Sequence, residues 1–401
     1  MASIVQEKVA QAAHILKEKG IDVWLTYVRE TVAGYDPVLP MIFGEQTLTW
    51  DSAMLLTAGG ESICLLGNLD RTLAEDTGAY QTVIGYDQSI RELLLKTIQR
   101  LDPQTIAVNM SKDDVFADGL HHGMYLKLLD YLQDTPYAER LVSSGAVVAA
   151  LRGRKSPAEI KRLRQSVTSA EAIYAHTFRQ LAYGMSEADV AALMQAEVTA
   201  RGLSTAWAEH SCPGVNVGAQ SVLGHASPKD LCIEPGSLVH FDFGVRQRGY
   251  CSDIQRMVYF LDEGETSAPP AVQHGFDTVV NALQAAVDAM RPGISGVEVD
   301  AIARKVVTEA GYPAFMHATG HQVGLETHDG GTVLGPAWER YGQTPFGLLE
   351  AGQVYAVEPT LVVEGHGIVG LEEDVLVTET GAVFLSNFQR ELILMPYQKA
   401  G

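Results

Sequence analysis

Two acidic residues lie in the C-terminal half of the chain within sequence typical of buried strands. The segment LVHFDFGVRQRGYCSDIQRMVYF, residues 238–260, alternates apolar and polar positions on both sides of glycine-containing turns and predicts a hairpin. Asp242 and Asp253 interrupt its apolar arms. A single acid of this kind is more often an edge or turn residue. Because a buried carboxylate is costly unless it is paired or binds a metal, two of them in adjacent strands indicate a cation.

Further acids occur in two later segments of β-type sequence. Glu358 stands within the apolar run VYAVEPTLVV, and GIVGLEEDVLVTET places Glu372, Glu373 and Asp374 at the start of another strand. Side chains alternate between the two faces of a strand, so Glu372 and Asp374 should face away from Glu373. Only one of these faces can point at a cleft.

Three histidines lie in the segment HATGHQVGLETHD, residues 317–329. His317 and His321 have the spacing of a zinc-binding helix, but no glutamate follows His317 as in HExxH, and Gly320 disfavours a helix. We therefore expect a loop and a strand, with one face formed by His321, Val323, Leu325 and Thr327. His328 then lies on the opposite face or in the turn beyond the strand. Considered singly, each histidine is more often a hydrogen-bonded structural residue than a ligand.

One histidine and four carboxylates together form an oxygen-rich donor set. This composition suits two hard or borderline divalent ions bridged by carboxylates, and two such ions would hold a bridging water.

The N-terminal part of the chain predicts a small α/β domain. Residues 3–19 have an amphipathic helical pattern that ends at Gly20, and strand-like and helical segments alternate up to about residue 150. Ser156, Pro157 and Glu159 then form a capping box with proline at the first helical position. The boundary between the two predicted domains, 1–152 and 153–401, is placed just before this box.

The second domain contains a candidate internal repeat. Residues 186–202 and 295–311 have equal lengths, open on serine, share Val-Thr near their ends and finish on glycine. A long helical pattern precedes each of them, at residues 158–182 and 272–290. Because short helices match by chance, the repeat is a hypothesis; if real, the domain has two related halves with a cleft between them.

Composition limits the classes of partner. The 401 residues carry a formal net charge of -20, which opposes binding to nucleic acid or to an anionic membrane. The four cysteines lack the spacing of a zinc knuckle or the density of a disulfide scaffold. Neither a signal peptide nor a membrane-spanning run is evident, so a cytoplasmic, soluble protein is expected.

The motifs of this sequence match the pattern of a known protein family over nearly the whole chain. The sequence resembles the pita-bread metallopeptidases, the group of methionine aminopeptidase, aminopeptidase P, prolidase and the creatinase relatives. The motifs FDFG, GYCSD, HATGHQVG, AVEP and LEEDVLV occur in family order. By this resemblance the metal ligands are Asp242, Asp253, His321, Glu358 and Glu372.

The resemblance implies an α+β fold. A two-halved pita-bread catalytic domain, with pseudo-symmetric helix pairs on a curved antiparallel sheet, would follow an N-terminal creatinase-like α/β domain. It also implies a homodimer, because members with this N-terminal domain are often homodimers.

Roles for further residues follow from the same resemblance. His225 would hydrogen-bond the scissile group, and His328 would stabilise the tetrahedral intermediate or relay protons. His317 would line the leaving-group side of the substrate site. Glu372 would take up a proton from the attacking water.

The function implied is that of a two-metal exopeptidase. It would hydrolyse the N-terminal peptide bond of peptides, in particular Xaa-Pro bonds, by attack of a metal-bridging hydroxide. Manganese is the first choice of metal, with cobalt, zinc or iron as alternatives. A metal-dependent hydrolase of a small non-peptide amide, as in ectoine-hydrolase or creatinase relatives, is the alternative; a non-catalytic binding protein is a third reading.

The sequence departs from the family pattern at positions that bear on substrate choice. Gly370 stands where many proline-specific members have arginine, and neither HDGGT nor GQTPFGLLEAGQV holds the arginine that dipeptidases use for a free carboxylate. Arg340 is the nearest candidate for that role. Gln255 replaces a common threonine, and Thr360 replaces a frequent glycine. These changes favour an aminopeptidase that accepts longer peptides over a strict dipeptidase.

Overall fold

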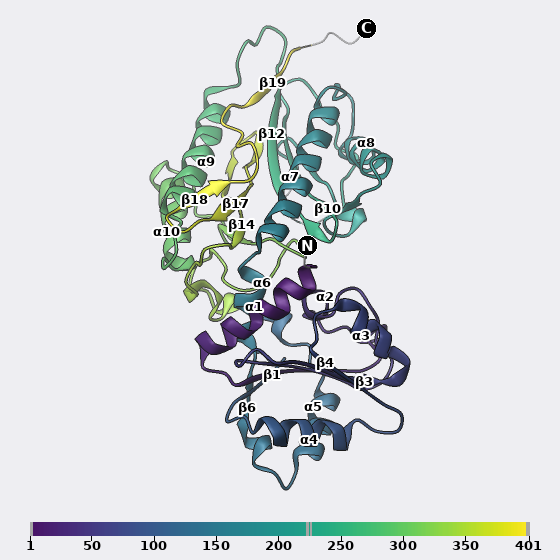
Figure 1. The fold of residues 1–401 in the computed structure, drawn as a ribbon. Coiled ribbons are helices and arrows are strands. Elements are labelled where there is room, and N and C mark those ends of the chain that lie inside the picture. The colour runs from purple at the N-terminus through teal and green to yellow at the C-terminus, as the bar shows by residue number, and fades with distance from the viewer. Residues whose placement is uncertain (1–2, 222–223, 225–226, 398–401) are drawn as a thin grey trace. The chain divides into compact units, whose positions relative to one another are not determined.

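The computed structural model describes residues 3–221, 224 and 227–397. The chain forms two compact units, Met1–Arg152 and Gly153–Gly401 (Figure 1). None of the described helices is both long and apolar enough to cross a membrane.

The first unit is built on a mixed six-stranded sheet with the strand order β4-β3-β2-β1-β5-β6. β1 runs antiparallel to β2 and parallel to β5. Figure 1 shows α4 and α5 on one face of this sheet and α1 on the other. The strands are β1 Val23–Val28, β2 Ser52–Thr57, β3 Ser62–Gly67, β4 Thr82–Tyr86, β5 Ile106–Val108 and β6 Leu141–Ser143. The helices are α1 Ile4–Lys19, α2 Leu39–Ile42, α3 Arg71–Thr77, α4 Arg91–Leu101, α5 His122–Leu132 and α6 Gly145–Gly153.

Helix α1 confirms the helix expected at residues 3–19. Ser3 is its N-cap, and Gln6 Oε1 accepts a hydrogen bond from the Ser3 N–H at 2.9 Å, which completes a capping box. Gly20 ends the helix in the left-handed region, with φ of 68°.

The second unit contains two helix pairs and several small sheets. Its helices are α7 Pro157–Phe178, α8 Glu187–Ala200, α9 Pro270–Ala289 and α10 Gly296–Glu309. The strands up to β12 are β7 Ser204–Thr205, β8 Gly214–Val217, β9 Leu238–Phe243, β10 Val245–Gln247, β11 Tyr250–Cys251 and β12 Ile254–Phe260. The later strands are β13 Gly320–Gln322, β14 Val354–Val357, β15 Thr360–Val363, β16 Gly367–Gly370, β17 Glu373–Val377, β18 Ala382–Phe384 and β19 Ile393–Met395.

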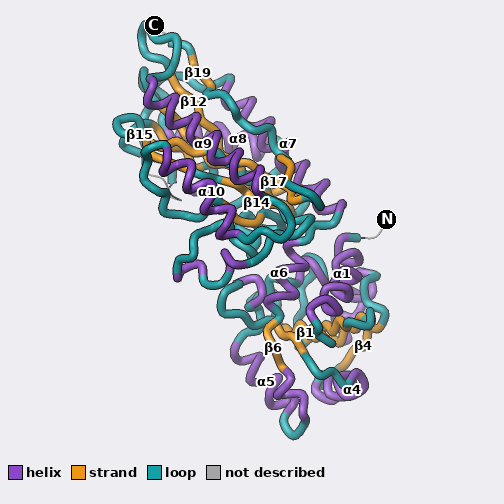
Figure 2. Tube along the Cα trace, turned by 90° about the vertical axis from the view of Figure 1, so that its left-hand side faces the viewer, coloured by secondary structure: helices purple, strands orange, loops and turns teal. Residues whose placement is uncertain are grey.

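The two helix pairs correspond to the predicted repeat. Ser186 and Ser295 are the N-caps of α8 and α10, and each forms a capping box with an acid three residues later. α7 precedes α8, and α9 precedes α10, although α7 ends four residues earlier than the expected 182. In Figures 1 and 2 the pairs lie on opposite sides of the strands β12, β14 and β17.

Each half has its own hydrophobic core. In the first half, the Tyr174 ring of α7 contacts Phe241 and Phe243 of β9 edge-on, with centroids 6.2 and 5.6 Å apart. In the second half, α9 lies so close to β15 that a Cβ at Gly275 would be 2.5 Å from Val363 Cγ2. The strands that carry the acidic residues are therefore fixed by packing from both sides.

Candidate metal centre

The first half of the second unit supplies two acids to a common place. β9 and β12 pair antiparallel, as the predicted hairpin requires, and Asp242 of β9 lies opposite Gln255 of β12. Asp253 is not within a strand but in the short connection between β11 and β12. Asp242 is partly buried and Asp253 is 4% exposed, so both carboxylates are held in a shielded position.

The second half supplies the remaining residues of the predicted set. His321 is the middle residue of β13, and its register partner in β14 is Ala356. Glu358 follows β14, and Glu372 precedes β17 and forms an isolated bridge with Gln255. This bridge joins the two halves directly, because the Gln255 N–H donates to the carbonyl oxygen of Glu372 at 3.2 Å.

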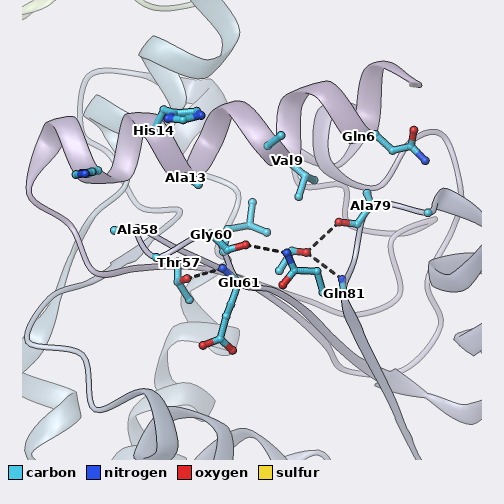
Figure 3. Close-up of a pocket in the computed structure, with 16 residues that line it drawn as sticks. Gln6, Val9, Ala13, His14, Thr57, Ala58, Gly60, Glu61, Ala79 and Gln81 are labelled. Carbon is cyan, nitrogen blue, oxygen red and sulfur yellow. Dashed lines mark hydrogen bonds between the residues drawn. The ribbon is translucent and has the colours of Figure 1, made fainter. Parts of the chain in front are cut away.

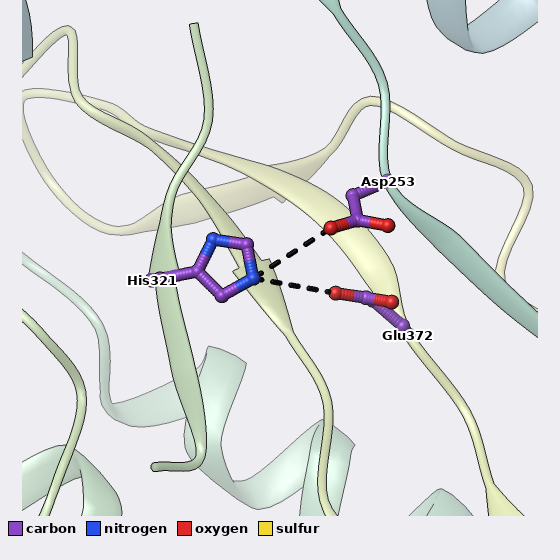
Figure 4. Close-up of side chains that lie close together, drawn as sticks. All are labelled: Asp253, His321 and Glu372. Atoms are coloured by element: carbon purple, nitrogen blue, oxygen red, sulfur yellow. Dashed lines mark ion pairs between the residues drawn. The ribbon is translucent and has the colours of Figure 1, made fainter. Parts of the chain in front are cut away.

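The ring of His321 faces the acids of both halves. Its Nε2 lies 3.6 Å from Asp253 Oδ2, 3.5 Å from Glu358 Oε1 and 3.8 Å from Glu372 Oε1. Figure 4 shows Asp253 and Glu372 approaching this nitrogen from two different segments of the chain. One donor atom from each of Asp253, His321 and Glu372 lies within 4.8 Å of the others, a spacing that could hold a metal ion.

Burial and mutual repulsion raise the pKa values of the acids. Burial raises the pKa of Asp242 to about 7 and that of Glu358 to about 8, where the charge of Asp242 adds to the effect. Burial, followed by the charges of the neighbouring acids, raises the pKa values of Asp253 and Glu372 well above the usual carboxyl range. The ionised cluster is therefore unfavourable without a cation.

Several carboxylate oxygens in this cluster also lack a hydrogen-bond partner. The buried oxygens without one include Asp242 Oδ1, Asp253 Oδ1, Glu372 Oε1 and Asp374 Oδ1. Buried polar atoms in folded proteins are nearly always hydrogen-bonded or bind a metal. The residues present thus fit divalent cations, which would satisfy both the charges and the unpartnered oxygens.

Neighbouring acids at the start of β17 face opposite ways, as the alternation predicts. Asp374 accepts a hydrogen bond from the Asp253 N–H at 3.2 Å and so faces the centre. Glu373 is turned away and pairs with Arg256 through Nη1 to Oε1 at 2.8 Å. Ser386 and the Gln389 N–H donate to the same carboxylate.

The strand predicted through Thr327 is wrong beyond Gln322. β13 ends there, and the chain turns back so that the Asp329 N–H donates to the Gln322 carbonyl oxygen at 2.8 Å. A buried ion pair between Lys155 Nζ and Asp329 Oδ2, at 2.9 Å, holds this turn, and a Cβ at Gly324 would be 2.0 Å from the same Asp329 oxygen. The residues expected on one strand face therefore do not share one.

The three histidines outside the ligand set have different surroundings. The exposed ring of His328 lies edge-on to the His321 ring, with centroids 4.2 Å apart. His317 lies within hydrogen-bond distance of the Ala318 carbonyl oxygen through Nδ1, at 2.8 Å, and of Thr360 Oγ1 through Nε2, at 2.6 Å. Both of its ring nitrogens are thus engaged by the protein itself. His225 lies outside the described residues.

The sequence interpretation did not include a second layer of polar residues behind the ligands. Gln255 Nε2 donates to Glu358 Oε2 at 3.3 Å, and Gln255 Oε1 lies 2.8 Å from His240 Nε2. His240 stands two residues before Asp242 in β9, so the period of a strand already places both on one face. This two-residue spacing was the sequence signal from which His240 could have been identified.

The first unit contains a pocket whose polar groups differ from those of the metal centre. A pocket of about 540 Å³ lies between α1 and the turn that joins β2 to β3 (Figure 3). Its polar groups are bonded to one another: Gln81 Nε2 donates to the Gly60 carbonyl oxygen, and Ser62 Oγ to that of Ala79. None of the residues that line this pocket has a buried side-chain nitrogen or oxygen without a hydrogen-bond partner. The acid cluster of the second unit differs from this pocket, because several of its buried carboxylate oxygens have no hydrogen-bond partner.

Comparisons with known proteins identify the family to which the chain belongs. The Peptidase_M24 model, described as metallopeptidase family M24, matches residues 161–379, more than half of the chain. A Bacillus subtilis protein named uncharacterized peptidase YqhT is 31% identical over 281 residues, which are 69% of this chain and 73% of that protein. The Xaa-Pro dipeptidase of Pyrococcus furiosus is 31% identical over 248 residues, 62% of this chain and 67% of its own.

A solved structure extends the similarity to the whole fold. The Xaa-Pro dipeptidase from Bacillus anthracis superposes with a TM-score of 0.74 at 24% identity, covering 98% of this chain and 100% of that one. The N-terminal unit is included in this match, so the expected pita-bread architecture with a preceding α/β domain is confirmed. The chain belongs to metallopeptidase family M24 and is a metallohydrolase of the pita-bread fold.

Proposed function

We propose that the protein removes the N-terminal residue from peptides with proline in the second position. Two divalent ions would be bound by Asp242, Asp253, His321, Glu358 and Glu372. The observation that carries the proposal is the cluster of shielded, partly unpartnered carboxylates within 3.5 to 3.8 Å of one imidazole nitrogen. The named activity of the Pyrococcus furiosus relative supports the choice of Xaa-Pro substrates.

Four carboxylates and one imidazole form a donor set for borderline and hard ions. Manganese is the expected metal, and cobalt, zinc and iron are the alternatives. When bound, such ions lower the pKa of water toward about 7 and polarise a carbonyl group. Metal analysis of the purified protein by mass spectrometry tests both the identity and the number of ions.

Glu372 is the residue that moves protons in this proposal. Its Oε1 is buried, has no hydrogen-bond partner and lies 3.8 Å from His321 Nε2. This oxygen is suited to accept a proton from the attacking water and to pass it to the leaving nitrogen. The transfer matters for an Xaa-Pro bond, because its nitrogen carries no hydrogen of its own.

His328 would act on the substrate oxygen. Its ring contacts that of His321 and is exposed, so a substrate bound at the centre can reach it. A donated hydrogen bond there would offset the charge that develops on the carbonyl oxygen. The same role for His225 remains a prediction from the sequence.

The surroundings of the centre favour longer peptides over dipeptides. Arg340, the nearest candidate for binding a free carboxylate, stacks over Trp338 at 4.6 Å and donates to the Met316 carbonyl oxygen. Gly370 provides no cation. A peptide that continues beyond proline does not need one at this position.

The proposal includes the assembly and the role of the first unit. Met1–Arg152 would be the creatinase-like N-terminal domain, and the protein would be a homodimer. Light scattering on the full chain after size-exclusion chromatography measures the mass in solution, and a monomer would contradict this part.

The deciding experiment adds Mn(II), Co(II) or Zn(II) to metal-free protein. An Xaa-Pro dipeptide, an Xaa-Pro-Xaa tripeptide, a non-proline peptide and small N-acyl diamines serve as substrates. Cleavage of the tripeptide but not of the dipeptide is expected. Cleavage of the diamines alone would reassign the enzyme to small non-peptide amides, and absence of metal uptake would overturn the two-metal proposal.

A further inference from the structure

Gly370, at the end of β16, has almost no free space where a side chain would begin. A Cβ at this position would lie 2.7 Å from Gln255 Oε1, 2.9 Å from His240 Nε2 and 3.0 Å from Thr360 Cγ2. Real Cβ atoms essentially never show the first two of these distances. Glycine at 370 and the long amide at 255 are therefore spatially linked.

Gln255 cannot easily move out of this space. The residue is 3% exposed, and its amide joins His240 Nε2, at 2.8 Å, to Glu358 Oε2, at 3.3 Å. When Glu358 is ionised, as metal binding requires, its carboxylate only accepts hydrogen bonds, so the amide NH₂ faces Glu358 and the amide oxygen faces the imidazole. Any displacement of the side chain breaks one or both contacts.

The backbone of Gln255 also lies at the junction of two other acids of the centre. It pairs with Asp242 across β9 and β12, and it forms the bridge to Glu372. A single residue is thus in contact with three of the proposed ligands. Asp242 and Glu372 are held by backbone pairing to Gln255, whereas Glu358 is held by the Gln255 side chain.

We propose that Gln255 is a positioning residue that orients Glu358 for metal binding, and that Gly370 is required because it leaves room for Gln255. The two departures from the family pattern, glutamine for threonine and glycine for arginine, are then one coupled change. The inference rests on the proposed function only in taking Glu358 as a ligand.

The amide at position 255 has a chemical consequence for the metal centre. The amide of Gln255 donates a hydrogen bond but leaves the full negative charge on the carboxylate. The His240 ring in turn fixes the amide orientation, as outer groups around metal ligands commonly do.

The first test replaces Gln255 by methionine, which has similar length but neither donates to Glu358 nor holds His240. Metal affinity, measured by calorimetry with Mn(II) on metal-free protein, should fall by about 10- to 100-fold, the usual effect of losing such a group. The visible absorption of the Co(II) form should also change, because its intensity depends on coordination geometry. Wild-type affinity together with a wild-type spectrum would overturn the proposal.

Gln353→Met is the matched control. Gln353 is also 3% exposed, and its Oε1 accepts from the Glu350 N–H at 2.8 Å and from the Tyr355 hydroxyl at 2.9 Å. This variant loses a comparable number of buried hydrogen bonds, made to Glu350 and Tyr355 and not to a ligand carboxylate. Its melting temperature should fall while its metal affinity stays at the wild-type value; an equal loss of affinity would reduce Gln255 to a general structural role.

The second test is a double-mutant cycle of Gly370→Ala and Gln255→Thr. In the wild-type background, the added methyl group should displace Gln255 and lower metal affinity by about tenfold or more. In the Gln255→Thr background the closest contact is gone and only those with His240 and Thr360 stay, so the same methyl should lower metal affinity less, by about threefold at most. Equal effects in both backgrounds would show that the positions are independent.

Glu358→Gln separates this inference from the proposed function. If Glu358→Gln keeps wild-type metal affinity, Glu358 is not a ligand and the ligand set of the proposed function fails. If it loses affinity while Gln255→Met does not, only the positioning role fails. Peptide cleavage by the wild-type protein is assayed independently of both outcomes.

Discussion

Glu372 and Glu373 are adjacent in sequence but face opposite sides of the chain, and their buried carboxylates have different surroundings. Glu373 is 0% exposed and bonded to Arg256, Ser386 and Gln389. Glu372 is 1% exposed, and its Oε1 has no hydrogen-bond partner. The first carboxylate is compensated by the protein, so it stabilises the fold. The second lacks compensation and fits a cation from outside the chain.

The difference also extends to neighbouring elements. Arg256 of β12 points away from the centre, toward Glu373, while Gln255 one residue earlier points toward it. The only side-chain cation that pairs with β17 among the described residues is thus on the structural face. The other face keeps several acids together without one, which is the arrangement that favours metal binding over internal pairing.

The largest effect is expected when an acid on the cation-free face is changed. Asp253→Asn should lower kcat/KM by more than about 10³-fold, as loss of a charged group from a preorganised site does, and should reduce the metal content. Assays with Mn(II) and metal analysis measure both quantities. A fully active variant would refute the assignment of Asp253.

A change on the structural face should affect stability instead. Glu373→Gln leaves Arg256 buried, with Glu171 at 3.9 Å as its acidic partner among the described residues, and should lower the free energy of unfolding by about 3–5 kcal/mol. Urea titration of the metal-free protein measures this loss. The double variant Arg256→Met with Glu373→Leu should cost less than the single one, because no unpaired charge stays buried. A stable single variant that has lost its metal would remove the distinction between the two faces.

Much of this arrangement is predictable from local sequence. The capping boxes at Ser156, Ser186 and Ser295 specify where three helices begin, and each is found in the structure. The alternation of strand residues separates Glu373 from Glu372. These signals succeed because the deciding interactions lie within a few residues of one another.

The features that sequence reasoning missed depend on distant contacts. The chain turns after Gln322 because Lys155, 174 residues from Asp329, pairs with it. The contact between Gly370 and Gln255 likewise joins two strands that are far apart in sequence. A periodic pattern contains no information about such partners, so the strand predicted through Thr327 was too long.

The pH dependence of stability should differ between the metal-free and metal-bound forms. Burial raises the folded-state pKa of Asp242 to about 7 and of Glu358 to about 8, so the folded protein holds these protons more tightly than the unfolded chain. The stabilisation that these protons give the folded state is fully present below the pKa values of the unfolded chain, near 4. It is lost as the pH rises through the folded-state pKa values. The melting temperature of metal-free protein should therefore fall between pH 5 and pH 8.5.

Metal should reverse this trend, because binding requires deprotonated carboxylates. The increase in melting temperature caused by Mn(II) should thus grow with pH over the same range. Asp242→Asn, which removes one of the raised pKa values, should flatten the metal-free profile. If that variant keeps the wild-type slope, Asp242 does not titrate in this range.

The smallest effect concerns His317, whose engagement by the protein contrasts with the exposure of His328. Thr360→Val removes the hydroxyl that lies 2.6 Å from His317 Nε2, and it should cost about 1 kcal/mol of unfolding free energy, the worth of one hydrogen bond. Thr278→Val is the matched control, since this buried hydroxyl donates to the His274 carbonyl oxygen at 2.7 Å within α9. Both variants should lose similar stability and keep similar kcat/KM values if His317 only supports the pocket. A tenfold loss of kcat/KM confined to Thr360→Val would instead place His317 among the residues that contact substrate. The loss of the Thr360 hydroxyl would then have changed how His317 Nε2 interacts with the substrate, and not only the stability of the fold.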